Sequence, residues 1–495
     1  MSRVEQFGSR WGLVLATLGM AVGTGNIWRF PRIAASNGGG SFLVAWVVFL
    51  LLWSIPLIIA EFAFGKRARK GTIGAFVEIG GPKTAWMGAW VAVCATAIMI
   101  YYAVVSGWCL RFLAASLTGD LTSSAGASEA LWTTFNSSWA AVLTQGLALA
   151  AALAVVWFGV RGIERVATIL IPTLFVLVVI LAIRAVTLPG AERGLAFLFT
   201  PDWSALAKPD IWLQALTQNA WDTGAGWGLI LTYAVYMRAR EDVALNGFLI
   251  GFGNNSVSLL AGIMVLCTVF AINPGAQAEI VGAGNEGLTF IWIPQLFAQM
   301  PGGAVFMVLF FLALSFAALT SLISMFELAT RVLIDAGLSR RVALFGLGAV
   351  AFVLGLPSAL YIEVFQNQDW VWGVGLMLSG LFIAIAAIRF GVDRLRTEVV
   401  NGDGADLRIG RWWTIAIIAL IPIQAIALIV WWLVVAYQSN PEGWLDPFSP
   451  FNVGSVLFQW AIVLVVLLLA NRWLVRRLSG PPSDTSPPKG GEVIP

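Results

Sequence analysis

Long apolar stretches separated by short polar segments run through almost the whole chain. A helix needs about 20 mostly apolar residues to cross the hydrocarbon core of a bilayer. Twelve stretches qualify, at residues 11–36, 41–64, 86–117, 139–158, 166–187, 211–237, 243–271, 302–335, 341–357, 370–390, 411–437 and 453–475. The pattern predicts an all-α membrane protein with twelve transmembrane helices. The first stretch is longer than a signal peptide's apolar region and lacks its cleavage site, so we expect it to be retained.

Lysine and arginine are concentrated in alternate connections between these stretches. The connections at 118–138, 272–300 and 438–452 contain neither residue, whereas those after spans two, four, six, eight and ten are basic. Because cytoplasmic loops are enriched in basic residues, both termini are expected in the cytoplasm of a bacterium, with the protein in its inner membrane. Residues 1–10 would form a cytoplasmic N-terminus. Residues 478–495, rich in Pro, Gly and Ser, are expected to be a disordered cytoplasmic tail.

Glycine clusters interrupt spans one and six. The sequences are GMAVGTGN at 19–26 and DTGAGWG at 222–228. Each glycine costs a helix interior about 1 kcal/mol relative to alanine, so clusters favour unwinding, although glycines also allow close packing of membrane helices. The clusters fall in the first helix of two five-span blocks, 11–187 and 211–390. Five is odd, so the blocks enter the membrane from opposite sides. This arrangement predicts a 5+5 inverted repeat with discontinuous helices 1 and 6, followed by two more spans at 411–477.

Composition supports this class of protein and argues against several others. Apolar residues make up 59% of the chain and charged residues 11%, against about 25% charged in soluble domains. Histidine is absent, and the three cysteines lie in apolar stretches without metal-ligand spacing. An enzyme is therefore not expected, because the usual general base and metal ligand are missing. No basic, aromatic-rich soluble segment indicates binding to nucleic acid.

Several motifs resemble the neurotransmitter:sodium symporter family, and its bacterial amino-acid transporters in particular. The longest is GMAVGTGNIWRFP at 19–31, which is followed by glycines at 38–40. Further similarity lies at IYY (100–102), RGIER (161–165), TYAVY (232–236), ALTS (318–321) and Asp369, so that it covers about residues 7–390.

The resemblance implies one or two bound Na⁺ ions. The first site would use the Ala21 carbonyl, Asn26, Asp222, Asn254 and the carboxylate of the substrate. The second would use the carbonyls of Gly19, Val22 and Ala317 and the hydroxyls of Thr320 and Ser321. Helical spacing independently puts Ala317, Thr320 and Ser321 on one face. Hydroxyls in such helices also often bond only the carbonyl one turn before them.

The resemblance also implies a substrate pocket and two gates. The pocket would be lined by Ala21, Gly23, Gly25, Ile98, Tyr102, Trp221, Gly224, Trp227, Ser321 and Met325. Tyr102 would bind the substrate carboxylate, unless it is an ordinary interfacial tyrosine. Arg29 and Asp369 would form the outer gate, and Tyr236 and Asp335 the inner one. The family's N-terminal arginine aligns with Val4, next to Arg3, so the partner of Asp335 stays open.

Asp222 departs from the family pattern. Chloride-dependent relatives surround an anion with a tyrosine, a glutamine and serines; here Gln218 and Ser258 fit, but Trp46 and Asp222 replace the other ligands. We therefore expect no chloride requirement, with Asp222 supplying the negative charge or, alternatively, carrying a proton. The function hypothesis is sodium-coupled symport of an amino acid or similar carboxylate-bearing solute into the cell. A proton-coupled or exchange carrier is the alternative, and a sensor or channel is less favoured. The expected partners are the solute and the lipid bilayer; the oligomeric state stays open.

Overall fold

The computed structural model describes residues 5–124, 126–275 and 277–478, and throughout these residues the regular structure is helical. Within these described ranges, ten helices are long and apolar enough to cross a membrane. Spans one and six are not among these ten because each is broken into shorter helices. With them, the described residues form twelve spans, as predicted.

The first five spans are α1 (Arg10–Ala21) with η1 (Gly25–Arg29) and α2 (Phe30–Ser36); α3 (Gly40–Phe49) with η2 (Leu50–Ser54) and α4 (Ile55–Ala68); α6 (Ala85–Thr118); α8 (Trp139–Val156); and α9 (Gly159–Val186). The next five are α11 (Pro209–Asp222) with α12 (Leu229–Ala234); α13 (Val243–Ile272); α17 (Gly303–Asp335); α18 (Arg340–Leu360); and α19 (Ile362–Phe390). The last two are α21 (Trp412–Ile415) with η8 (Ala416–Leu420) and α22 (Ile421–Ser439), and α23 (Val453–Leu478).

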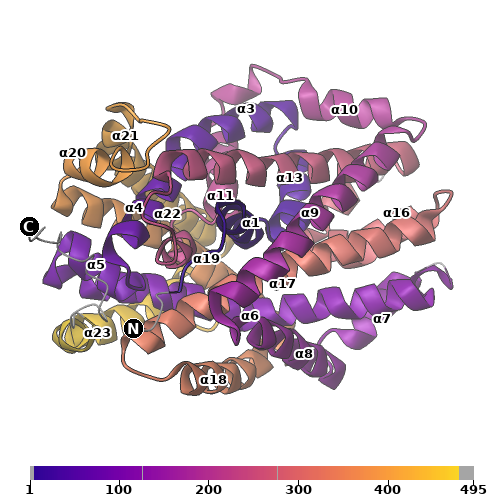
Figure 1. The fold of residues 1–495 in the computed structure, drawn as a ribbon. Helices are drawn as coiled ribbons and strands as arrows, with labels where there is room; N and C mark the ends of the chain where they lie inside the picture. Colours follow the sequence, from indigo (N-terminus) through magenta and orange to yellow (C-terminus); the bar gives the residue numbers. More distant parts are fainter. Residues whose placement is uncertain (1–4, 125, 276, 479–495) are drawn as a thin grey trace, which may run out of the picture.

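Short helices in the connections lie at two opposite ends of the molecule. Figure 1 shows α5 (Thr72–Gly80) and α20 (Val392–Leu395) at the left, and α7 (Ala127–Phe135), α10 (Ala191–Phe199) and α16 (Ile293–Ala298) at the right. The connections after spans two and ten thus lie at one end and those after spans three, five and seven at the other, as expected when every span crosses a bilayer. Other short segments are η3 (Pro82–Thr84), η4 (Asp120–Thr122), η5 (Ala205–Ala207), α14 (Gln277–Gly282), α15 (Gly284–Glu286), η6 (Gly287–Trp292) and η7 (Arg396–Val400).

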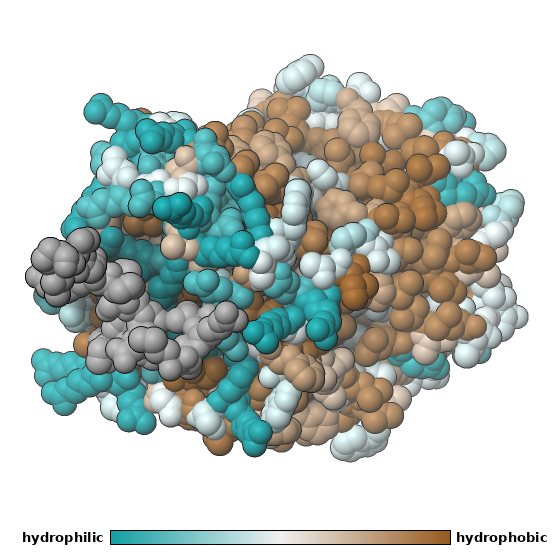
Figure 2. All heavy atoms as spheres, in the orientation of Figure 1, coloured by the Kyte–Doolittle hydropathy of each residue, from teal (hydrophilic) through white to brown (hydrophobic). Residues whose placement is uncertain are grey.

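The surface matches a lipid environment. Figure 2 shows a broad hydrophobic belt between a strongly hydrophilic left end and a thinner hydrophilic rim at the right. Large apolar side chains such as Leu469, Ile423 and Val353 are exposed on α23, α22 and α18. Such a surface is unfavourable in water and favourable against acyl chains. The tail was predicted to begin at residue 478, but Leu478 is the last residue of α23. The rest of the predicted tail, residues 479–495, lies outside the described residues.

Both predicted helix breaks are present. Helix α1 ends at Ala21, and Val22 has an extended backbone with φ −77° and ψ 95°. Helix α11 ends at Asp222, and α12 begins at Leu229. Between them, Gly224, Gly226 and Gly228 have φ values of 68°, 92° and 77°. Because this left-handed region is strained for residues with a Cβ atom, these glycines allow the chain to unwind there.

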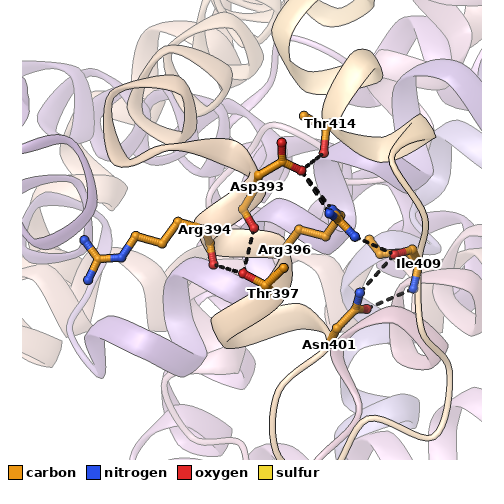
Figure 3. A network of polar contacts seen from close by, with 7 residues as sticks. All are labelled: Asp393, Arg394, Arg396, Thr397, Asn401, Ile409 and Thr414. Atoms are coloured by element: carbon orange, nitrogen blue, oxygen red, sulfur yellow. Dashed lines mark hydrogen bonds and ion pairs between the residues drawn. The ribbon is translucent and has the colours of Figure 1, made fainter.

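The chain between spans ten and eleven is held by a polar network, drawn in Figure 3. Asp393 accepts hydrogen bonds from Thr414 Oγ1 (2.9 Å) and Arg396 Nη2 (3.0 Å). These bonds lower the pKa of the Asp393 carboxyl from its usual value. Asn401 forms two hydrogen bonds of 2.9 Å with the backbone of Ile409. The network therefore fixes the loop that returns the chain to the membrane.

Candidate substrate and sodium site

A cavity of about 720 Å³, measured with its open mouth, lies where the two broken spans face each other. Helices α6, α17 and α19 supply its other walls. All ten residues predicted for the substrate pocket line it: Ala21, Gly23, Gly25, Ile98, Tyr102, Trp221, Gly224, Trp227, Ser321 and Met325. Residues from four distant parts of the sequence therefore meet at one place.

The unwound segment of span one is held by side chains. Gly23 N donates to Asn26 Oδ1 (2.8 Å). The Tyr102 hydroxyl accepts hydrogen bonds from Thr24 N (3.1 Å) and Thr24 Oγ1 (3.2 Å). Tyr102 thus contacts the break and lines the cavity. Its predicted role in binding the substrate requires this position, whereas an interfacial tyrosine would lie at the membrane surface.

Oxygen atoms of the first predicted sodium site converge beside the cavity. The end of the Asn254 side-chain amide lies 3.0 Å from the Asp222 carbonyl oxygen and 3.1 Å from the Ala21 carbonyl oxygen, and with its nitrogen on this side the amide donates to both. With its oxygen on this side, the amide instead accepts a hydrogen bond from Asn26 Nδ2 (3.0 Å) and presents an oxygen to an ion. Hard cations such as Na⁺ favour clusters of carbonyl and carboxylate oxygens, which otherwise repel one another.

Asp222 brings a carboxylate to this cluster. The side chain is 3% exposed, and Oδ1 has no hydrogen-bond partner among the described residues. Oδ2 accepts hydrogen bonds from Gln218 Nε2 and from Ser258 Oγ (3.4 Å). A Cβ atom on Gly25 would lie 2.8 Å from Oδ1, so glycine is needed for this close approach.

The second predicted sodium site lies where the C-terminal end of α1 meets α17. Ser321 Oγ donates to the Met20 carbonyl (3.2 Å). A Cβ atom on Gly19 would lie 3.2 Å from Thr320 Cβ, which shows how closely the helices pack. Carbonyls at a helix C-terminus carry partial negative charge and suit a cation. In this structure the Thr320 hydroxyl bonds its own helix, at Phe316 O (2.9 Å) and Ala317 O (3.2 Å), which is the alternative noted for such hydroxyls.

The proposed outer-gate residues share the cavity without forming an ion pair. Arg29 and Asp369 both line it, but the ion pairs of the described residues do not include this one. The Arg29 guanidinium instead lies over the Trp221 ring, 4.5 Å from its centroid. The Trp221 ring in turn fits against Gly373, where a Cβ atom would lie 1.7 Å from it.

The proposed inner-gate residues have separate partners. Asp335 forms an ion pair with Arg331 (2.8 Å) and accepts a hydrogen bond from Gly71 N (2.6 Å). Tyr236 Oη donates to Glu327 Oε1 (2.6 Å). The Arg331 guanidinium lies 5.8 Å from the centre of the Tyr236 ring and so links the two groups. Arg3, the neighbour of the family's arginine position, lies outside the described residues.

Three carboxylates in important positions were not identified from the sequence. Glu61 is fully buried in α4, and it accepts hydrogen bonds from Gly226 N (2.7 Å) and Leu231 N (3.1 Å) in the broken span six. Glu327 is fully buried in α17 and pairs with Arg340 (2.6 Å). Both are acidic residues within apolar stretches, which is a general sign of function in membrane helices.

Glu164 holds the start of span one from a distant helix. It lies near the start of α9, and its carboxylate accepts hydrogen bonds from Gly8 N (2.7 Å) and Ser9 N (3.1 Å). A carboxylate is favoured at this end of α1 by the exposed amides and the helix dipole. Glu164 belongs to the RGIER motif, but no feature of the motif indicates which groups it would bind.

Two half-helices that end at a shared oxygen-lined cavity, inside a bundle of twelve membrane spans, define an ion-coupled membrane carrier. A model of the sodium:neurotransmitter symporter family matches residues 4–141 and 130–478. The protein therefore belongs to the sodium:neurotransmitter symporter family, and it is a sodium-dependent transporter rather than an enzyme.

Similar proteins occur in archaea, bacteria and animals. An uncharacterised sodium-dependent transporter of Methanocaldococcus jannaschii is 30% identical over 490 residues, covering 94% of this chain and 97% of its own. The YhdH transporter of Bacillus subtilis, also uncharacterised and sodium-dependent, is 32% identical, with 85% and 96% covered. The structure of MhsT in complex with L-phenylalanine superimposes with a TM-score of 0.77 at 32% identity, covering 86% of this chain and 99% of MhsT. These comparisons confirm the predicted family and fold class.

Proposed function

We propose that this protein imports an amino acid, or a similar small solute with a carboxylate, together with one or two Na⁺ ions by alternating access. The observation that carries the proposal is the meeting of both helix breaks at one cavity, beside the carbonyl oxygens of Ala21 and Asp222 and the side-chain amide of Asn254. The solute carboxylate would complete the first ion's shell. Each ligand would then raise the affinity for the other, and this reciprocal effect couples their transport.

An amino acid is the preferred substrate class for two reasons. MhsT, a relative of similar fold, is described in complex with L-phenylalanine. Gly23 is the second reason. Family members that carry monoamines have an aspartate at this position, so with glycine here the solute would bring its own carboxylate. The two tryptophans of the pocket lie edge to face, with ring centres 6.5 Å apart, and limit the space for the side chain of the solute.

The sodium gradient is sufficient for strong accumulation. A membrane potential of 100 mV is worth about 2.3 kcal/mol for one charge. A tenfold concentration gradient adds about 1.4 kcal/mol. One Na⁺ ion thus supplies roughly 3.7 kcal/mol, or accumulation of several hundredfold.

Uptake into proteoliposomes tests this function. A thermal-shift screen of the twenty amino acids, with and without Na⁺, first identifies the solute. Its uptake should then stop when Na⁺ is replaced by choline. Uptake that continues in choline and follows an imposed pH gradient would instead favour the proton-coupled carrier, and binding without uptake would favour a sensor.

Chloride independence is the second part of the proposal. The Asp222 carboxylate lies beside Gln218 and Ser258, where it would replace the charge of an anion. Uptake should therefore be unchanged when gluconate replaces chloride. Asp222→Ser should abolish uptake or make it chloride-dependent. Loss of wild-type uptake in gluconate would refute this role.

The loop composition supports an orientation with both termini in the cytoplasm of a bacterial inner membrane. Cysteine residues introduced singly into the two basic connections 66–71 and 238–242, and into the non-basic connection 438–452, would test it. A membrane-impermeant maleimide should label only the third in intact cells.

A further inference from the structure

The gate carboxylate Asp369 lies on a helix whose opposite side is tied to the last two spans. On α19, Phe365, Asp369 and Gly373 are spaced four residues apart and so share one face. Phe365 and Asp369 line the cavity, and Gly373 receives the Trp221 ring. Residue 367 therefore lies on the opposite side of α19, and residues 368 and 370 lie on its two flanks.

Side-chain amides on the other side of α19 form a closed network with α23. Gln459 Nε2 donates to Asn367 Oδ1 (2.9 Å), and Gln368 Nε2 donates to Gln459 Oε1 (3.2 Å). Gln368 Nε2 also donates to Asn367 Oδ1 (3.1 Å). Asn367 Nδ2 donates to Ser455 Oγ (3.2 Å) and to the Pro450 carbonyl (2.9 Å). Every amide of this half-buried network thus has a partner, a condition that favours a rigid and specific arrangement.

Aromatic contacts extend the attachment to span eleven. The Trp370 ring lies edge to face with Trp432 of α22, with centres 4.8 Å apart, and with Phe451, 6.2 Å away. Trp372 Nε1 donates to Gln368 Oε1 (2.9 Å), which fixes the amide from the side of α19. Residues on both sides of Asp369 in the sequence are therefore held by spans eleven and twelve or by the loop between them.

We propose that Gln459 is a positioning residue for the outer gate. Asp369 and Arg29 can close over the solute only if Asp369 keeps its place when Arg29 moves with span one. The network supplies this fixed point, because it joins the two residues before Asp369 to a helix that is not part of the cavity wall. Spans eleven and twelve, outside the predicted repeat, would thereby take part in retaining the solute. This inference rests on the proposed function.

The test compares two substitutions on the same helix. Gln459→Leu removes two hydrogen bonds beside the gate. Asn471→Leu is the matched control: Asn471 also lies on α23, and it bonds Trp86 N (3.0 Å) and the Pro82 carbonyl (3.2 Å), far along the chain from Asp369. In purified full-length protein with Na⁺, Gln459→Leu should raise the dissociation constant of the amino acid identified by the thermal-shift screen about fivefold, the equivalent of one net hydrogen bond, and should speed its release. Asn471→Leu should change neither.

The Asp369→Asn background separates positioning from general destabilisation. There Gln459→Leu should add less than a twofold change, because its effect acts through the carboxylate of Asp369. Equal effects in both backgrounds, equal effects of the two leucine variants, or unchanged release from Gln459→Leu would each overturn the proposal while leaving the proposed function intact. If Gln459→Leu does not fold, Gln459→Glu is used instead. It removes the N–H donor to Asn367 while preserving the size of the side chain, and the same results are expected. Failure of every amino acid to bind the wild-type protein would overturn both proposals.

Discussion

The Glu61 carboxylate is predicted to stabilise the broken span six. It is fully buried and accepts hydrogen bonds from the backbone amides of Gly226 and Leu231, at 2.7 and 3.1 Å. Glu61→Ala would leave two buried N–H groups without partners. Each such loss costs about 1–3 kcal/mol, so the free energy of unfolding should fall by about 2–6 kcal/mol. Glu61→Gln keeps one acceptor oxygen but turns an N–H donor toward the other amide. Its loss in the free energy of unfolding should therefore lie between zero and that of Glu61→Ala.

Denaturant unfolding in detergent micelles measures this loss, and sodium-driven uptake measures its functional effect. The substrate cavity is built on the same unwound segment. A loss of more than about 1.4 kcal/mol there corresponds to more than a tenfold change, so uptake by Glu61→Ala should fall more than about tenfold. Glu78→Ala is the matched control, because Glu78 is an exposed carboxylate on α5. If Glu61→Ala were as stable and active as Glu78→Ala, the reasoning about the break would be refuted.

Three further substitutions test other parts of the structure. Gly25→Ala places a methyl group 2.8 Å from Asp222 Oδ1, so the Na⁺ concentration for half-maximal uptake should rise at least about tenfold. Arg340→Gln leaves the fully buried Glu327 without its ion partner and should lower the free energy of unfolding by about 3 kcal/mol, measured as for Glu61. Glu286 lies outside the spans, and burial raises the pKa of its carboxyl, so its charged form destabilises the fold. Glu286→Gln should therefore raise the melting temperature relative to wild type at neutral pH. This difference in melting temperature should shrink as the pH falls toward 4.5, because the wild-type carboxyl is then protonated as well.

Each of these has a result that contradicts it. An unchanged sodium dependence in Gly25→Ala would mean that the Asp222 carboxylate is not at the ion site. Wild-type stability of Arg340→Gln would mean that Glu327 is not charged or not buried in the membrane. A pH-independent difference for Glu286→Gln would exclude titration of that carboxyl as its cause.

The sequence by itself was sufficient for the class of the protein. A bilayer requires about twenty apolar residues per span, so the hydropathy pattern predicts the number of spans. Helix breaks are also local, because they depend on glycines that can adopt left-handed backbone angles, as at 224, 226 and 228. The resemblance to the family then predicted ten pocket residues, and all ten line one cavity.

Only the tertiary structure decided how distant polar groups pair. The partners of Glu61 and Glu164 lie on other elements, and Asp335 binds the distant amide of Gly71; no local rule selects such partners. The state of the gate is also a tertiary property, since Arg29 stacks on Trp221 rather than pairing with Asp369. Hydrophobicity and backbone conformation act locally along the chain, whereas a buried charge is stabilised by whichever donors the packed helices bring to it.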